Sequence, residues 1–353
     1  MNVEHTTRLA LPGKGTLEAA TLAFLAECGM KVNRNNPRQY LARISSMPDL
    51  EVVFQRAADI PSLVQDGDAA LGITGYDILA EYRGNGDEDG DEDDYDDDLI
   101  MLERDLNYGN CRLVVAVPET WIDVSTCADL WHLAGYYQAH KERVLRIATK
   151  YPALTGQFLR RHGITHCKII SPHGALEAAP LTDTADLIVD LTETGTTLRE
   201  NHLKLLEDGV VLRSQACLIG NARLLRHNEQ ALHVATMMLE LIEAHTQARN
   251  RSILTAFIPG ESVDSVQQKY SHLKDFVADT QLQISVPGRE TAGLYTLSGI
   301  VNVKGSAAGL LEIVTALRKA GASYINITPL TYRFAEESVS VRSLRERLKR
   351  IHE

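Results

Sequence analysis

Cysteine is scarce in this chain, and long hydrophobic runs are absent. The five cysteines among 353 residues are scattered, odd in number and form no Cys-x-x-Cys pair. This argues against a disulfide scaffold or a zinc site. No stretch approaches the roughly 18 apolar residues of a membrane span, and residues 1–8 lack the apolar core of a secretory signal. These absences favour a cytoplasmic protein without a membrane partner.

The acidic charge of the chain is concentrated in one segment. The formal net charge is −11, and ten acidic residues lie between positions 87 and 98, so the rest of the chain is nearly neutral. A run of like charges is typical of a solvated loop, and no EF-hand spacing indicates a calcium site there. The acidic balance argues against nucleic acid as a partner. A polyanionic substrate would have to be attracted by local basic groups and metal ions.

Apolar strands alternate with short helices along the first 250 residues. Residues 8–12 form an expected strand, which is followed by a Gly13-Lys14-Gly15 turn and a helix over 17–28. Further strands are expected at 50–54, 69–73, 112–117, 144–148, 168–170, 186–191, 210–212 and 216–219, and a long helix at 229–248. This alternation predicts an α/β architecture with a largely parallel sheet.

The pattern changes after residue 251. Strands are expected at 252–258, 282–286, 294–303 and 324–328, with helices at 263–277 and 307–319. The order βαββαβ is that of a ferredoxin-like module, of the kind used for regulatory ligand binding. The tail, residues 336–351, has the pattern of a basic amphipathic helix, and we expect it to serve packing or assembly.

The sharpest functional signal is the segment 186–198. A buried strand is expected to carry Asp186 and Asp190 to its carboxyl edge, where Thr194-Gly195-Thr196-Thr197 opens a helix. Backbone N–H groups and the helix dipole at such a turn bind a phosphate monoester. Asp190 lies close enough in sequence to take sugar hydroxyls. The alternative is a plain strand-to-helix turn capped by Thr194, but the two upstream acids favour a functional site.

Together with Glu177, this segment resembles the signature of ATP phosphoribosyltransferases. The matching residues are Glu177, Ala185-Asp186, Asp190-Leu191 and Thr194-Gly195-x-Thr197-Leu198. Residues 8–11, 56–75, 111–113 and 146–152 also resemble segments of that family. The C-terminal module resembles the regulatory domain of the family's long form. The resemblance therefore covers most of the chain.

The resemblance implies a two-lobed α/β catalytic region, similar to periplasmic binding proteins, and a C-terminal ferredoxin-like regulatory domain. Lobe I is expected at 1–115 and 207–251, lobe II at 116–206, and the regulatory domain with its terminal helix at 252–353. The implied reaction transfers the 5-phosphoribosyl group from phosphoribosyl pyrophosphate to N1 of ATP, the first step of histidine biosynthesis. Mg²⁺ as cofactor, feedback inhibition by histidine, and homodimers and homohexamers are also implied.

The resemblance also implies roles for individual residues. Thr194, Gly195, Thr196 and Thr197 would hold the 5-phosphate. Glu177 and Asp190 are the candidate catalytic residues, which would face the ribose and support positive charge on the sugar; no metal ligand is assigned. The other candidates for substrate binding are Lys14, Gly15, Arg56, Arg112, Thr149 and Lys150.

Several alternatives stay open at this stage. Lys14 also fits a solvated loop lysine, and Arg56 also fits an ion-pair partner of Asp59. Thr16 stands where the family commonly has arginine, and lysine does not replace arginine in bidentate phosphate binding. This departure leaves room for a catalytically silent nucleotide- or histidine-sensing protein of the same fold. A phosphoribosyltransferase for free nucleobases would share the acid-rich strand but not the C-terminal module.

Overall fold

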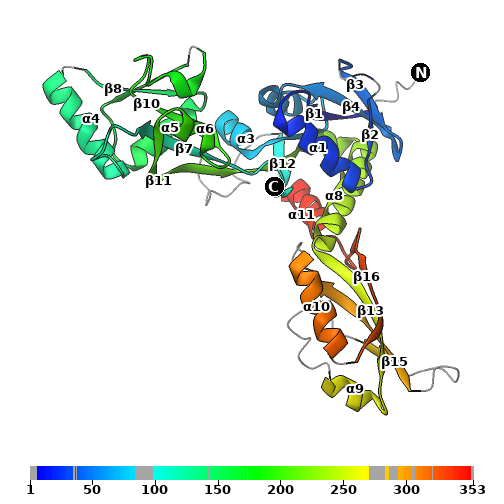
Figure 1. Cartoon of the computed structure of the whole chain (residues 1–353). Helices are drawn as coiled ribbons and strands as arrows, with labels where there is room; N and C mark the ends of the chain where they lie inside the picture. The colour runs from blue at the N-terminus through cyan, green and yellow to red at the C-terminus, as the bar shows by residue number, and fades with distance from the viewer. Residues whose placement is uncertain are drawn as a thin grey trace, which may run out of the picture. The chain divides into compact units, whose positions relative to one another are not determined.

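The computed structural model describes residues 6–84, 98–269, 283–285, 293–303, 307–319 and 321–350, apart from residues 35, 37, 142 and 173. The chain divides into two compact units, Met1–Leu239 with Val339–Glu353, and Glu240–Ser338. The described residues form three sheets (Figure 1). Most of the acidic run falls outside the described residues, so its prediction as a loop is untested. None of the described helices is both long and apolar enough to cross a membrane.

The first sheet forms lobe I, and β1 (Thr7–Pro12) lies in its middle. Leu9, Ala10 and Leu11 are completely buried, as expected for a parallel strand covered on both faces. β1 pairs in parallel with β4 (Met47–Gln55) and β5 (Leu71–Gly75). The order is β2-β3-β4-β1-β5-β12-β6, with β2 Val32–Asn33, β3 Leu41–Ile44, β12 Ala216–Asn221 and β6 Leu99–Glu103. The lobe's helices are α1 Thr16–Glu27, α2 Ile60–Gln65, α3 Tyr76–Arg83 and α7 Ala222–His227, with α8 following at Glu229–Ala248.

The second sheet forms lobe II, in the order β11-β7-β10-β8-β9. β8 (Leu145–Thr149) lies between β9 (Cys167–Ile170) and β10 (Leu187–Thr192) and is parallel to both. β7 (Cys111–Pro118) is antiparallel to β10 and to β11 (Leu203–Ser214). The helices are α4 Cys127–Lys141, α5 Pro152–Arg161 and α6 Thr196–Glu200. The expected two-lobed α/β region is thus confirmed.

The expected boundaries of the lobes are each wrong by part of a strand. They fall at 115/116 and 206/207, inside β7 and β11, and both strands belong to the sheet of lobe II. Because β7 pairs with both β10 and β11, its entire length is held in lobe II. The chain therefore changes lobes before Cys111 and after Ser214. Backbone pairing decides to which sheet a strand belongs, and the hydrophobic pattern of a strand does not specify the strand with which it pairs.

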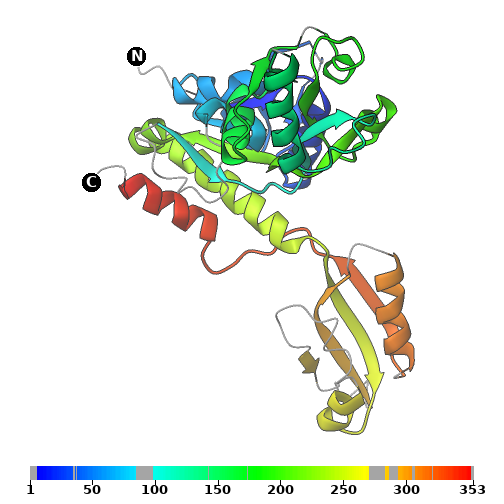
Figure 2. The same ribbon diagram turned by 90° about the vertical axis from the view of Figure 1, so that its left-hand side faces the viewer.

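The third sheet, in the second unit, has the predicted ferredoxin-like order. Its elements are β13 Arg251–Pro259, α9 Val263–Lys269, β14 Gln283–Ser285, β15 Leu294–Asn302, α10 Ala307–Lys319 and β16 Ser323–Pro329. The strands pair antiparallel in the order β14-β15-β13-β16. Helix α10 lies along one face of this sheet (Figure 2) and buries Ile313 and Leu317 in one core with Leu254 and Leu297. The described elements thus confirm the βαββαβ prediction.

The terminal helix does not belong to this module, contrary to the prediction that placed it at 252–353. Helix α11 (Val339–Arg350) groups with the first unit and packs against β6 and α7 (Figure 2). Val341, Leu344 and Leu348 are buried there. Ser340 Oγ donates to Glu103 Oε2 at 3.0 Å, and Arg347 donates to the carbonyl of Met101. The helix is amphipathic as predicted, but its apolar stripe is covered by lobe I.

Candidate active site

The predicted phosphate-binding turn follows β10, and its glycine, Gly195, has a left-handed backbone conformation. Gly195 has a φ of +77°, and its N–H donates to Thr192 Oγ1 at 2.8 Å. The exposed hydroxyls of Thr194 and Thr196 hydrogen-bond to each other at 2.9 Å. The first N–H groups of a helix, which in α6 include that of Thr197, have no acceptor within the helix. The Thr196 N–H donates to Thr194 Oγ1 at a long 3.4 Å. The turn therefore combines the N–H groups at the start of α6 with exposed hydroxyls, which suits a phosphate.

An arginine that sequence analysis missed lies beside this turn. Arg199 Nη1 donates to the carbonyl of Thr194 at 3.4 Å, and Nη2 donates to Thr196 Oγ1 at 3.3 Å. The contact with Thr196 joins residues three positions apart on one helix face. In the sequence, only the three-residue spacing of Thr196 and Arg199 could have indicated that this arginine reaches the turn. The guanidinium adds a positive charge to the turn, which favours an anionic group there.

Replacing Gly195 with alanine is expected to destabilise the protein by about 1–2 kcal/mol, because a Cβ is strained at this φ. The new Cβ would also lie 3.4 Å from Arg199 Nη1. Gly135→Ala is the control, because Gly135 lies within α4, has no positive φ and has open space around its Cβ position. Urea unfolding of both variants checks this. Equal stability losses would show that the backbone of the turn carries no special strain.

Two acids and a lysine of the predicted set share one electrostatic neighbourhood. Burial raises the pKa of Asp190, and the charge of Glu177, in the short turn η2 (Leu176–Ala178), raises it further. The Leu191 N–H, which donates to Asp190 Oδ1 at 2.8 Å, and the charge of Lys150 act in the opposite direction. A half-buried carboxylate beside a second acid is destabilised, and a cationic ligand or metal would relieve that repulsion.

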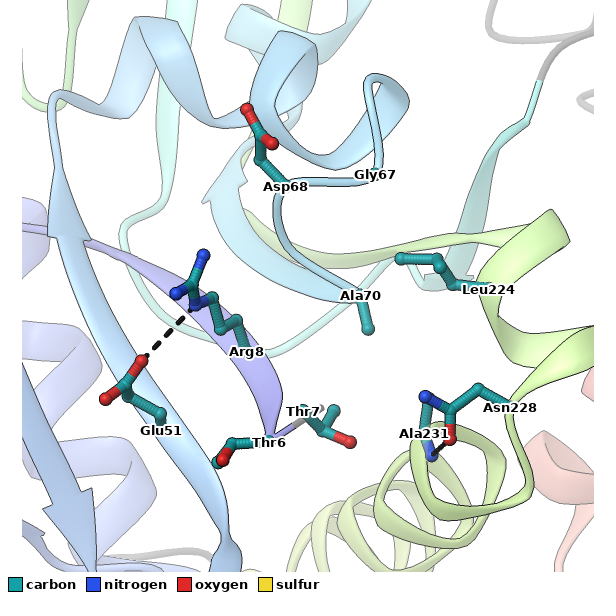
Figure 3. Close-up of a pocket in the computed structure, with 10 residues that line it drawn as sticks. All are labelled: Thr6, Thr7, Arg8, Glu51, Gly67, Asp68, Ala70, Leu224, Asn228 and Ala231. Carbon is teal, nitrogen blue, oxygen red and sulfur yellow. Dashed lines mark hydrogen bonds and ion pairs between the residues drawn. The ribbon is translucent and has the colours of Figure 1, made fainter. Parts of the chain in front are cut away.

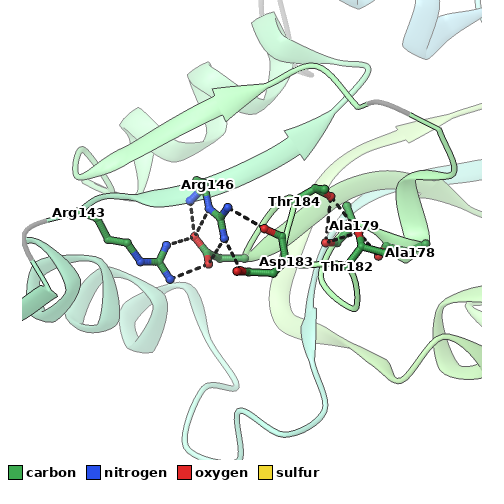
Figure 4. A network of polar contacts seen from close by, with 8 residues as sticks. Arg143, Arg146, Ala178, Ala179, Thr182, Asp183 and Thr184 are labelled. Carbon is green, nitrogen blue, oxygen red and sulfur yellow. Dashed lines mark hydrogen bonds and ion pairs between the residues drawn. The ribbon is translucent and has the colours of Figure 1, made fainter.

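Asp186 lies at the other end of the strand, so the prediction that both acids reach the carboxyl edge is wrong. It precedes β10, and at strand spacing it lies roughly 13 Å from Asp190. Arg143 Nη1 and Nη2 donate to its two carboxylate oxygens at 2.8 and 3.0 Å, and the backbone N–H of Arg146 donates at 2.8 Å (Figure 4). Burial opposes ionisation, but these hydrogen bonds outweigh it and lower the pKa of Asp186. Asp186 is therefore a structural ion-pair partner.

Three predicted residues of lobe II differ in what they face. Thr149 is 2% exposed, and its Oγ1 accepts a hydrogen bond from the Tyr151 N–H at 3.0 Å, so it shapes the turn after β8. Lys150, the next residue, is exposed. Arg112 is half-buried and stands opposite Thr192 in the β7–β10 register, at the carboxyl end of β10. Lys150 and Arg112 thus flank the phosphate-turn strand, whereas Thr149 acts through the backbone.

The predicted residues of lobe I gather at the carboxyl edge of its sheet. β1 and β4 are parallel and end in register, Pro12 beside Gln55, so that Lys14 and Arg56 follow neighbouring strand ends. Both side chains are exposed, and Gly15 has a φ of +84°. The structure records no ion pair between Arg56 and Asp59, both of which it describes. The ion-pair alternative for Arg56 therefore has no support.

A buried aspartate connects the two carboxyl edges. Asp77, two residues after β5, accepts hydrogen bonds from Tyr151 OH at 2.7 Å and from Ser214 Oγ at 2.6 Å. Burial and the negative charge of Asp77 raise the pKa of Tyr151. Gly75 makes room for this carboxylate, since a Cβ there would lie 2.5 Å from Asp77 Oδ1. Because Tyr151 follows Lys150, this contact brings the end of β8, with Lys150, toward the β5 edge of lobe I.

A second acid on α3 supports the same junction. Glu81 accepts hydrogen bonds from the N–H groups of Ala153 and Leu154, at 2.8 and 3.0 Å, and thus caps the start of α5. In each lobe, two neighbouring parallel strands lead into connections that run in opposite directions across the sheet, β1 and β5 in lobe I and β8 and β10 in lobe II. Ligands of open α/β sheets bind outside the carboxyl ends of strands at such switch points. Both predicted sets lie there.

A pocket of about 740 Å³ lies elsewhere, at the amino ends of β1 and β5 (Figure 3). Its lining includes Thr7, Arg8 and Ala70, with Asn228 from the start of α8. Arg8 Nε is paired with Glu51 Oε2 at 3.3 Å beside it. None of the predicted site residues lines this pocket, so its size does not make it the substrate site.

Comparison with known proteins agrees with the resemblance found in the sequence. The model of a family described as ATP phosphoribosyltransferase matches residues 56–244. ATP phosphoribosyltransferase 2, chloroplastic, from Arabidopsis thaliana is 38% identical over 94% of this chain and 78% of its own length. ATP phosphoribosyltransferase from Brucella anthropi is 44% identical over 65% of this chain and 95% of its own. A chain of the Thermotoga maritima ATP phosphoribosyl transferase (HisG:HisZ) complex superposes with a TM-score of 0.49 and 27% identity, covering 67% of this chain and 98% of that one.

Proposed function

This chain belongs to the ATP phosphoribosyltransferase family, and on that premise we propose that the carboxyl edges of its two lobes form one active site. The enzyme transfers the 5-phosphoribosyl group from phosphoribosyl pyrophosphate to N1 of ATP and releases pyrophosphate, in the first step of histidine biosynthesis. The relatives favour this enzyme over a silent sensor of the same fold. One observation carries the assignment of the site: the phosphate turn and the Asp190–Glu177–Lys150 group share the switch point of lobe II.

In this proposal Thr194, Gly195, Thr196 and Thr197 bind the 5-phosphate, with Arg199 as an additional cation. Asp190 and Glu177 face the ribose. Lys14 and Arg56 of lobe I attract the phosphates of the second substrate or the pyrophosphate, assisted by Gly15, whose lack of a side chain lets the backbone approach. Lys150 and Arg112 complete the positive lining at the edge of lobe II. These cations supply the local attraction that the acidic chain as a whole lacks.

The chemistry asks the protein for positioning and electrostatic support. Adenine N1 carries an unprotonated lone pair near neutral pH, so no side chain has to create the nucleophile. Holding two substrates in line can supply about 7–11 kcal/mol of the barrier. As pyrophosphate leaves, positive charge develops on the sugar, and the negative carboxylates of Asp190 and Glu177 stabilise it. The hydrogen bond from Tyr151 to Asp77 holds the carboxyl edges of the two lobes next to each other.

We propose Mg²⁺ as the cofactor. The carboxylate oxygens of Glu177 and Asp190 are ligands that Mg²⁺ accepts. Burial and, after it, the charge of Glu177 raise the pKa of Asp190, so a cation beside the two carboxylates is favourable. When bound, Mg²⁺ neutralises charge on the leaving pyrophosphate.

Histidine is the proposed regulator, and the ferredoxin-like unit over residues 240–338 is its proposed binding domain. The resemblance of this module to the regulatory domain of the family's long form supports this proposal. Homodimers and homohexamers, and a cytoplasmic location, belong to the same proposal. Light scattering of the purified chain with and without histidine tests the assembly. A monomer under both conditions would contradict it.

Turnover by the purified chain is the direct test of the function. Mixed with ATP, phosphoribosyl pyrophosphate, Mg²⁺ and pyrophosphatase, the protein is expected to raise the ultraviolet absorbance that accompanies N1 substitution of adenine. The signal should require both substrates and should fall when histidine is added. Folded protein that binds histidine without turnover would support the silent sensor. Thr16→Arg would then test whether the departure at that position is the cause.

A further inference from the structure

A cysteine, a histidine and an aspartate from three separate elements of lobe II meet away from the candidate active site. Cys127 begins α4, His162 follows the end of α5, and Asp208 lies in β11. One potential ligand atom of each lies within 4.8 Å of the other two. Cys127 and Asp208 are 81 residues apart, so the grouping is invisible in the sequence.

The backbone around Asp208 is built to present its carboxylate. The pairing of β11 with β7 shifts register between Leu205 and Val210, and such bulges redirect side chains. The Cys127 N–H donates to Asp208 Oδ1 at 2.7 Å, and the thiol donates to the Asp208 carbonyl at 3.7 Å. These two contacts hold Asp208 against Cys127, with the aspartate side chain at the exposed surface.

We propose that Cys127, His162 and Asp208 form a zinc-binding site with water as the fourth ligand. Sulfur, imidazole nitrogen and carboxylate oxygen are the ligands that zinc takes, and three protein ligands leave one position open. Tetrahedral zinc bond lengths place ligand atoms about 3.3–3.6 Å apart, so these side chains need to approach by roughly 1 Å. His162 is exposed and supplies most of this movement, whereas buried Cys127 and the Asp208 carboxylate held by its N–H are the fixed part of the site.

The donor set separates this site from the proposed Mg²⁺ site. Mg²⁺ takes oxygen ligands and does not compete for a thiolate and an imidazole. Zinc binds the thiolate, so a bound ion has to displace the thiol proton of Cys127. A bound ion would tie α4, α5 and the bulge of β11 together. The scattered cysteines argued against zinc because the sequence shows no neighbouring ligand, and the fold supplies two.

Cobalt provides the test, because it occupies zinc sites and shows a charge-transfer band only when bound by a thiolate. Chelator-treated full-length protein, kept in excess Mg²⁺, is titrated with Co²⁺ and then with Zn²⁺. We expect one Co²⁺ per chain with a sulfur band in the near ultraviolet, which Zn²⁺ abolishes. Cys127→Ser should lose the band, and His162→Gln should weaken Co²⁺ binding by at least about tenfold.

Cys167→Ser and His166→Gln are the matched controls, since both residues are close to α5 in the chain but outside the cluster. They should keep the band and the affinity. A folded wild-type protein without a sulfur band, or a band that survives Cys127→Ser, would overturn the proposal. His162→Gln decides the question if the serine variant does not fold, because His162 is exposed and its loss spares the core. Unchanged Co²⁺ affinity in that variant would also refute the site.

Discussion

Replacing Asp190 with asparagine is expected to lower kcat/KM by about 100-fold while leaving the protein at least as stable at neutral pH. Loss of a charge that stabilises a transition state in a protected site commonly lowers the rate by about 10²–10³-fold, and we expect a loss at the lower end of this range. The position of Asp190 beside Glu177, at the end of the phosphate-turn strand, places this charge at the proposed ribose site. Steady-state kinetics with both substrates varied measures the loss.

The expected stability of Asp190→Asn follows from the direction in which the pKa of Asp190 is shifted. Burial, followed by Glu177, raises the pKa of Asp190 in the folded protein. The folded state therefore binds the proton more tightly than the unfolded state, and the stabilisation present at low pH is lost as pH rises through the folded pKa. Asparagine cannot ionise and avoids this loss. Urea unfolding near pH 4 and pH 8 should show the variant gaining stability relative to wild type at the higher pH.

Asp123→Asn provides the control for Asp190→Asn, since Asp123 is an exposed acid of the same lobe. It should leave both kinetics and stability unchanged. Full activity of Asp190→Asn would remove the proposed catalytic role. A loss of stability that parallels the loss of activity would instead make Asp190 a structural residue.

Asp186→Asn is expected to have the opposite outcome, with a loss of about 2–3 kcal/mol of stability and a preserved kcat. Breaking a buried ion pair costs about 3–5 kcal/mol, and we expect less here because Arg143 and Arg146 are 40% and 30% exposed. The pKa of Asp186 is lowered in the folded protein, so its stabilisation is present at neutral pH and is lost as pH falls through that pKa. The difference between wild type and variant should therefore shrink in acid.

Asp183→Asn is the matched control for Asp186→Asn. Asp183 also contacts Arg146, but its side chain is 90% exposed, and asparagine tolerates its φ of +54°. We expect a loss below about 1 kcal/mol. Urea unfolding at neutral pH measures both variants, and kinetics below the unfolding range measures kcat. Equal losses, or a fall in kcat for Asp186→Asn at full folding, would contradict the structural role of this ion pair.

Asp186 and Asp190 show which features of a motif the sequence predicts and which it does not. Asp186 and Asp190 stand four residues apart in one apolar strand, and both matched the same pattern. The pattern identified the strand and the glycine turn that follows it. It did not show that β10 begins after Asp186, nor that Arg143 and Arg146 come to meet this residue. A strand carries its two ends to opposite edges of a sheet, and only the position of the strand ends decides which acid faces a ligand.

Residues that act across the lobes were also beyond the sequence. Asp77 lies 74 residues from Tyr151 and 137 from Ser214, and no local spacing links them. Its one local signal was the position of an acid in the first helical turn after the Thr74-Gly75 strand end. Arg199 was overlooked because a helical arginine is usually a solvated surface residue.

By itself, the sequence determined the α/β alternation, the ferredoxin-like order after Arg251 and the tight turn at Gly195. Each of these depends on periodicity, on turn residues or on the short-range geometry of neighbouring residues. Only the tertiary structure decided that β7 and β11 join lobe II, that α11 packs on lobe I, and that Cys127 meets His162 and Asp208. Strand pairing, the partner of an apolar helix face and contacts between distant side chains arise from the packing of whole elements, because local patterns are compatible with several partners.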